Sequence, residues 1–484
     1  MLAAGFAPAQ DQPDPGAREQ QEPTYEAPYI FNRQAAFGLY ELAEISAPID
    51  MPAVPVAPVP PESDYDGPTI LSRGNSLPPA TKGAMLAFGL YAQIIGVYDS
   101  GLMPVFAPGK PATAIGSYGE ETNFGASASH RWRRGKFSLE YRGSYLRYTN
   151  APEFDGFDQL LQIAYSQALA RHVTLDVKTT VGTTTIANGS FSYFPLESLD
   201  RIGIPTDELF DNRTNYLQSR VDLTWRLTPR LSFDFGGDGF VVRRQSLLLA
   251  GLNGYSARAS VAYRLTPRQT ISAIYDNTYF DFQNAFGSSR LETTALEYSN
   301  SLTREWDLNI LGGGVRVATL GLTEVALDPA IAALIGQSLA SVTFHNARYL
   351  PVVEVRLIRR FKEGSLTFLY SSSVTPGNGL YLTSRQTFGD VAYSLIAGRN
   401  LRARANAGYN QLSALGQALG KYSNLQGGIQ VLYKLMGATY LEVRYDYRHY
   451  TTRYMTGDAF LEMDSNRVSV GLGFGLGEAS SVTW

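Results

Sequence analysis

Hydrophobic and polar residues alternate along most of this chain, and the pattern is clearest at residues 438–452, "ATYLEVRYDYRHYTT". Every second residue belongs to a mostly charged set: Glu442, Arg444, Asp446 and Arg448. The residues between them are apolar or aromatic: Leu441, Val443, Tyr445 and Tyr447. A period of two is that of a β-strand with two different faces. A soluble sheet would bury the apolar face, whereas a membrane barrel would turn it to lipid and keep the charges in its lumen.

Alternating stretches of this kind, bounded by turn residues, occur about 18 times from residue 84 onward. We expect strands at residues 84–98, 121–133, 137–149, 158–169, 172–184, 213–227, 231–243, 253–265, 269–282, 290–303, 306–317, 346–359, 365–374, 381–395, 400–411, 422–435, 438–452 and 464–477. Most of them are far longer than the average globular strand of about 5–6 residues. A tilted transmembrane strand needs about 9–11 residues, which these stretches supply.

The connections between the expected strands alternate between short and long. Short ones include "TPR" at 228–230 and 266–268, and long ones include 185–212 and 318–345. Short turns at one end and long loops at the other are typical of outer-membrane barrels. An even number of strands also puts both chain ends on the short-turn side, which is the periplasmic side.

An aromatic residue recurs just before the short turns. The segments "WRLTPRLS" (225–232) and "YRLTPRQT" (263–270) share aromatic–Arg–Leu–Thr–Pro–Arg, and "YSLIAGRN" (393–400) and "YKLMGATY" (433–440) keep the aromatic residue and the leucine. Proline after threonine presets the turn. The aromatic residues share the apolar phase of their strands, so we expect an interfacial girdle. Its members are Trp225, Tyr263, Tyr393 and Tyr433.

The charged face is expected to be the interior, because a closed barrel of about 18 strands is too wide for large apolar side chains to fill. The expected pore-lining residues are Glu140, Arg142, Arg220, Asp222, Arg226, Asp234, Arg258, Arg264, Glu354, Arg356, Arg402, Arg404, Glu442, Arg444, Asp446 and Arg448. Basic and acidic residues interleave, so they can pair with neighbours. The pairs either stiffen a wide wall or set a transverse field that orients solutes. The predicted fold class is thus all-β, a transmembrane antiparallel up-and-down barrel of 16 to 18 strands.

Residues 1–83 differ from the rest in composition. They hold 14 of the 25 prolines and carry 11 acidic and 4 basic residues. Such a segment cannot build a core and is expected to be largely disordered. The start, "MLAAGFAPAQDQ", is typical of the end of a secretory signal, although a chance alanine-rich terminus is the alternative. We therefore divide the chain into a signal-peptide remnant with an acidic periplasmic segment (1–83) and an outer-membrane barrel (84–484).

The whole-chain composition narrows the class further. The 484 residues contain no apolar run near the roughly 18 residues that a spanning helix needs. Cysteine is absent, so the chain has no disulfide framework and no thiolate ligand for a metal. A formal net charge of −3 gives no reason to expect nucleic acid as a partner.

With its "Y/W-R-L-T-P-R" turns the chain resembles bacterial outer-membrane β-barrels of the putative β-barrel porin families, some of which are linked to exopolysaccharide export. The resemblance covers residues 84–484 at the level of architecture. It implies outer-membrane lipid as the surroundings and the barrel-assembly machinery as a partner. That machinery reads an amphipathic last strand, and here "RVSVGLGFGLGEASSVTW" keeps one apolar phase up to Leu476, with Val482 and Trp484 beyond an interruption.

Enzymatic chemistry is not expected. A lipase on a barrel surface needs a nucleophile beside a histidine. The four histidines are His130, His172, His345 and His449, and we expect interfacial or loop positions without a serine or aspartate partner for each. No metal-ligand cluster, cofactor motif or phosphate-binding glycine loop is evident in the sequence.

The composition and pattern predict a porin-like channel for passive diffusion of small polar solutes. The first alternative is the exit pore of an envelope export system, in which residues 10–83 dock a periplasmic partner or plug the pore. The second is a non-conducting receptor or scaffold whose long loops bind something outside the cell. The solute and the oligomeric state stay open.

Overall fold

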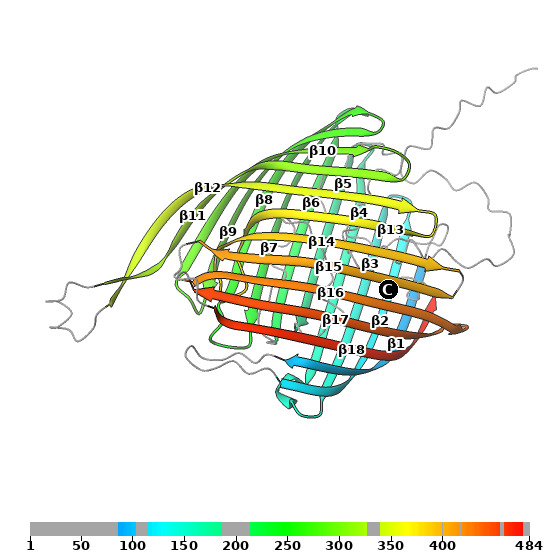
Figure 1. Ribbon diagram of the computed structural model, residues 1–484. Coiled ribbons are helices and arrows are strands. Elements are labelled where there is room, and N and C mark those ends of the chain that lie inside the picture. The colour runs from blue at the N-terminus through cyan, green and yellow to red at the C-terminus, as the bar shows by residue number, and fades with distance from the viewer. Residues whose placement is uncertain are drawn as a thin grey trace, which may run out of the picture.

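The computed structural model describes residues 86–102, 115–185, 213–326, 339–398, 400–415, 419–454 and 459–477. These residues form one sheet of 18 antiparallel strands that closes on itself (Figure 1). The predicted fold class is confirmed, and so is the upper end of the predicted strand number. The N-terminal segment and the last residues up to Trp484 lie outside the described residues.

The strands follow the predicted stretches closely. They are β1 (Leu86–Leu102), β2 (Ile115–Trp132), β3 (Gly135–Tyr148), β4 (Gly156–Ala170), β5 (Val173–Thr184), β6 (Thr214–Arg226), β7 (Leu231–Arg244), β8 (Gly251–Thr266), β9 (Gln269–Gln283), β10 (Gly287–Ser301), β11 (Trp306–Ala326), β12 (Leu339–Phe361), β13 (Gly364–Thr375), β14 (Ser384–Ala397), β15 (Leu401–Ala414), β16 (Leu419–Met436), β17 (Thr439–Tyr454) and β18 (Ala459–Gly477). A single 3-10 turn, η1 (Pro152–Phe154), interrupts the connection from β3 to β4. Among the described residues, no helix is both long enough and apolar enough to span a membrane.

Each strand pairs with its neighbours in sequence, and β1 pairs with β18 to close the barrel. The closing pair runs in register from Gly89 opposite Gly477 to Asp99 opposite Arg467. The even-numbered strands up to β16 lead into short turns, while the other connections are mostly longer and lie at the opposite end. Closure leaves no free edge within the wall, which is what a barrel in lipid requires.

Threonine explains the recurring turn sequence. In the turn between β6 and β7, the hydroxyl oxygen of Thr228 accepts hydrogen bonds from the backbone N–H groups of Arg230 (3.2 Å) and Leu231 (2.9 Å). Thr303 does the same for the N–H of Trp306 in the turn from β10 to β11 (3.2 Å). The side chain thereby satisfies donors that the ladder leaves free at the turn.

Strands β11 and β12 are longer than the alternation predicted. They pair with each other from Trp306 opposite Arg359 to Ala326 opposite Leu339. Strand β13 accompanies β12 only along residues 353–361, so residues 339–352 of β12 have β11 on one side alone. The two strands project well past the rest of the barrel (Figure 1). His345, which we expected in a loop, therefore lies in β12.

Side chains alternate between the two faces of the wall as predicted. In β9, for example, buried residues at even positions alternate with more exposed residues at odd positions over the whole strand. The buried positions face the interior, and most of the exposed ones carry large apolar side chains on the outside. This arrangement inverts that of a soluble protein and fits a wall surrounded by lipid.

Candidate functional site

The interior wall carries the charged residues that the alternation pointed to. All sixteen expected residues lie in the inward phase of their strands, and each is buried or half-buried. Ten of them are buried: Glu140, Arg142, Arg220, Asp234, Arg258, Glu354, Arg356, Glu442, Asp446 and Arg448. Six are half-buried: Asp222, Arg226, Arg264, Arg402, Arg404 and Arg444. Their role as a pore lining stays a prediction.

Several of these residues form ion pairs within one strand. Arg220 Nε lies 2.7 Å from Asp222 Oδ2 on β6, and Arg444 Nε lies 2.7 Å from Asp446 Oδ2 on β17. Arg142 pairs in the same way with Glu140 on β3. Residues two apart on a strand share a face, so the spacing in the sequence sets up the pair.

Other ion pairs cross between strands and include residues that the sequence reading missed. Arg258 on β8 lies 3.3 Å from Asp276 on β9. Arg467 on β18 reaches over β1 to Glu121 on β2, with 2.6 Å between Nη2 and Oε2. The sequence could have placed Asp276, Glu121 and Arg467 on the inward face, because each lies two residues from another inward position of its strand.

Glycine residues on β18 leave room for a hydrogen bond between the two strands on either side of it. Gln93 on β1 donates a hydrogen bond to Glu442 on β17, although β18 lies between the two strands. The inward positions of β18 at this level are Gly471 and Gly473. A Cβ atom at Gly473 would collide with the ring of Tyr440, so the missing side chain gives room to its neighbours.

The loop between β13 and β14, residues 376–383, folds into the barrel. The backbone oxygen of Gly379 accepts a hydrogen bond from the N–H of Ala250, which follows β7 (3.0 Å). Thr383 Oγ1 lies 2.6 Å from Ser289 Oγ on β10. Strands β9 to β12 separate β13 from β8 along the wall, so the loop crosses the interior to make these contacts. We predicted a loop at 375–380 but not its direction.

Local sequence explains how the loop can turn inward. Gly377 and Gly379 have positive φ angles of 75° and 86°, which residues with side chains rarely adopt. Asn378 Oδ1 accepts a hydrogen bond from the N–H of Tyr381 (3.0 Å), and the Tyr381 oxygen accepts one from the N–H of Asn378 (3.1 Å). Tyr381 is 0% exposed, and its ring lies 6.1 Å from that of Tyr422 on β16. Strand β14 consequently begins at Ser384, three residues later than predicted.

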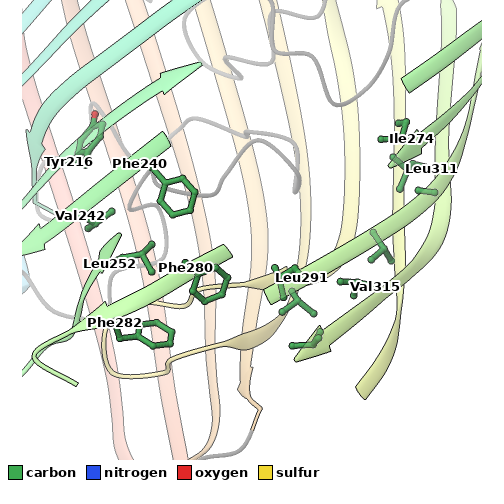
Figure 2. Packing of buried hydrophobic residues seen from close by; sticks show 14 of the residues in the cluster. Tyr216, Phe240, Val242, Leu252, Ile274, Phe280, Phe282, Leu291, Leu311 and Val315 are labelled. Carbon is green, nitrogen blue, oxygen red and sulfur yellow. The ribbon is translucent and has the colours of Figure 1, made fainter. Parts of the chain in front are cut away.

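Part of the interior is apolar, which the sequence reading did not anticipate. Strands β6 to β12 place a cluster in the inward phase that includes Tyr216, Phe240, Val242, Leu252, Phe280, Phe282, Leu291 and Val315 (Figure 2). Leu382, from the β13–β14 loop, packs against this cluster. The cluster therefore forms the apolar surface, here called the apolar seat, against which the inward loop packs. Phe240 and Phe280 point inward with the charged residues of their strands. They were not predicted to do so, because the inward face was recognised only by its charges.

The outside of the barrel is apolar and aromatic. Large exposed hydrophobic side chains occur on all 18 strands, including Leu322 on β11 and Val342 and Tyr349 on β12. Trp225, Tyr263, Tyr393 and Tyr433 are all exposed, each within a few residues of a short turn. A closed antiparallel sheet with such an exterior is stable only in lipid. The protein has the architecture of a transmembrane β-barrel. The girdle itself stays a prediction.

Comparison with solved structures finds outer-membrane porins at low similarity. The outer membrane protein OpdK from Pseudomonas aeruginosa matches with a TM-score of 0.40 and 12% identity, over 80% of this chain and 99% of that one. OccK2 (OpdF) of that species, in complex with glucuronate, matches at 0.40 and 13%, over 81% and 96%. A BenF-like porin from Pseudomonas fluorescens Pf-5 matches at 0.40 and 11%, over 81% and 98%. No protein-family model and no curated protein matches the sequence. Similarities this low transfer no substrate to this chain.

Besides the loop position of His345, a second expectation about the histidines was wrong. We expected no partner for His449, but its Nδ1 lies 3.0 Å from Asp464 Oδ1 and its Nε2 lies 3.1 Å from Thr451 Oγ1. Asp464 comes from the adjacent strand, so the pair depends on strand register, which the sequence did not provide. Within the described residues, no group of three or more histidine, aspartate or glutamate side chains could hold a metal ion.

Proposed function

We propose that the protein is a porin-like channel through which small polar solutes diffuse across the outer membrane. The observation that carries the proposal is the interior of the barrel, where charged side chains line much of the wall beside an apolar cluster and the β13–β14 loop crosses the space between the strands. A charged wall keeps water and polar solutes at low cost, and an inward loop limits their size. The sixteen predicted residues are the pore lining in this proposal.

The channel should discriminate weakly between anions and cations. Arginines of the wall are accompanied by carboxylates at short distance, as in Arg220 with Asp222 and Arg444 with Asp446. Opposite charges so close together largely cancel at the distance of a passing ion, and salt screens the remainder. Such pairs set a local transverse field rather than a net potential along the pore.

The inward loop favours small solutes over a polymer. An exit pore for a polysaccharide needs an unobstructed bore, whereas residues 376–383 are tied to Ala250 and Ser289 across the interior. A role of residues 10–83 in docking a periplasmic partner or in plugging the pore stays a prediction, since they lie outside the described residues. Assembly by the barrel-assembly machinery is likewise predicted.

Single-channel conductance in planar bilayers tests the proposal. The full chain is compared with a version that lacks residues 10–83, and reversal potentials in a salt gradient report ion selectivity. Liposome swelling with sugars of increasing size reports the size limit. We expect discrete conductance steps from both proteins, a small reversal potential and a sharp size limit.

The alternatives predict different results. If only the shortened chain conducts, the N-terminal segment is a plug and regulated export becomes the better account. If neither protein conducts although the barrel is folded, the channel proposal is wrong and the outer loops become the functional surface.

A further inference from the structure

A second cluster of polar side chains lies on the outer face of the barrel, near the loop end of β17 and β18. His449 on β17 and Asp464 on β18 are directly opposite each other in the ladder, and Thr451 follows two residues further along β17. They share the outward phase of Val443 and Tyr445, which are exposed on the same strand. The cluster is therefore separated from the interior by the wall and plays no part in the proposed diffusion path.

The geometry is that of a nucleophile, a base and an orienting acid. In the tautomer with its proton on Nδ1, His449 donates to Asp464 Oδ1 (3.0 Å) and accepts at Nε2 from the hydroxyl of Thr451 (3.1 Å). The hydroxyl of Tyr447 donates to the same oxygen of Asp464 (2.6 Å) and so holds the carboxylate in place. Glu462 Oε1 lies 3.8 Å from Nε2, where it stabilises the ring once it has taken up a proton.

We propose that Thr451, His449 and Asp464 hydrolyse acyl esters of lipids at the outer surface of the barrel. Polar and aromatic side chains near a strand end lie at the level of the membrane interface, where lipid ester bonds also lie. The His449 side chain is 31% exposed and that of Asp464 is 60% exposed, so the base is open to the lipid side. The exposed side chains of Val443 and Tyr445, further from the loop end, offer an apolar surface for the acyl chain.

The reaction uses water as its second substrate. Thr451 Oγ1 attacks the carbonyl carbon of the ester while His449 Nε2 takes the hydroxyl proton. The bond between the carbonyl carbon and the alkoxy oxygen then breaks, and the alcohol leaves with the proton from His449. Water attacks the acyl-threonine and gives a proton to His449, which returns it to Thr451 as the fatty acid leaves. The sum is ester plus water to acid plus alcohol, without oxidation or reduction.

Asp464 acts as a positioning residue in this scheme. It holds the imidazole in the required tautomer and stabilises the imidazolium, and it does not itself take up the proton. Its replacement should therefore lower kcat and leave KM unchanged. Restoring a carboxylate with Asp464→Glu should recover part of the loss, which a purely structural role for the side chain would not predict.

The test measures fatty-acid release by the folded full chain in vesicles of phosphatidylethanolamine and phosphatidylglycerol, with p-nitrophenyl palmitate in micelles as a second substrate. We expect Thr451→Ala and His449→Gln to reduce kcat by a factor of about 100 or more, in the range that general-base catalysis contributes. Thr451→Ser should remain active. The control is His130→Gln, because His130 is also exposed on the outer face, and it should leave the rate unchanged.

A covalent probe tests access to the nucleophile, since Thr451 is only 8% exposed. A fluorophosphonate should label the wild type and leave Thr451→Ala unlabelled. The proposal is overturned if the wild type releases no fatty acid, or if Thr451→Ala or His449→Gln keeps the full rate. Conductance of the same variants should stay at the wild-type value, so failure of the hydrolase and failure of the channel are distinguishable.

Discussion

Replacing Tyr381 with alanine should free the β13–β14 loop from the interior of the barrel. The side chain is 0% exposed and packs beside Tyr422, so the substitution removes a large buried ring. Truncating a buried aromatic residue costs about 3–5 kcal/mol. Because about 1.4 kcal/mol corresponds to a factor of ten, even 3 kcal/mol shifts the balance between docked and released loop by about 100-fold.

A second substitution, with a smaller expected effect on loop release, serves as a comparison. Ser289→Ala removes the hydrogen bond to Thr383 and leaves the packing of Tyr381 intact. Loss of one hydrogen bond costs about 1 kcal/mol, which corresponds to a shift of about fivefold. The two variants should therefore rank in a fixed order, with Tyr381→Ala having much the larger effect.

Unitary conductance in planar bilayers is the assay, read as the fraction of time in a wider state. The wild type should reside mostly in its narrow state, Ser289→Ala should visit a wider state more often, and Tyr381→Ala should occupy it far more. Tyr409→Ala is the matched control, because Tyr409 is exposed on the outer face of β15. If Tyr381→Ala folds and conducts like the wild type, the loop does not narrow the pore. If Ser289→Ala has the larger effect, packing does not hold the loop.

Three other substitutions test separate features of the barrel. Gly377→Ala should also release the β13–β14 loop, because the φ angle of Gly377 is 75° and the new Cβ atom would overlap the carbonyl oxygen of Tyr381. A variant that conducts like the wild type would refute this prediction. Arg258→Leu removes the arginine that pairs with the buried Asp276 and should destabilise the barrel by about 3–5 kcal/mol. Thermal unfolding in detergent should show a lower unfolding temperature for Arg258→Leu, whereas Arg258→Lys should unfold close to the wild-type temperature. Val443→Arg puts a charge against lipid and should lower the free energy of unfolding, measured with urea in vesicles, by about 2–4 kcal/mol. Gln426→Arg on the inward face should lower it little, and equal effects of the two substitutions would contradict the assigned faces.

The strands and their two faces could be predicted because a barrel wall repeats one rule along the whole chain. Alternation of the kind seen at residues 438–452 fixes which side chains point the same way, and closure fixes which side is inside. The ion pair of Arg444 with Asp446 follows directly from that spacing. The projecting parts of β11 and β12 escaped prediction because no turn residue marks where a wall ends and a free hairpin begins.

Features that depend on register or on contacts across the barrel could not be read from the sequence. His449 meets Asp464 because of the offset between β17 and β18, which nothing within either strand reveals. The inward course of residues 376–383 depends on two glycines and on the apolar seat formed by strands far away in sequence. Phe280 lies in that seat and would have looked misplaced in a lumen that was assumed to be polar throughout.

The hairpin of β11 and β12 sets how far the molecule reaches. Residues 339–352, about 45 Å of strand at about 3.3 Å per residue, run past the last pairing with β13, and residues 339–343 also run past the last pairing of β11 with β10. One edge of that strand has backbone groups with no neighbouring strand, so water or an approaching molecule must satisfy them. If the longer connections face outward, as they do in barrels of this kind, a molecule that approaches from that side, such as an antibody or a phage tail, encounters this hairpin before it encounters the wall of the barrel.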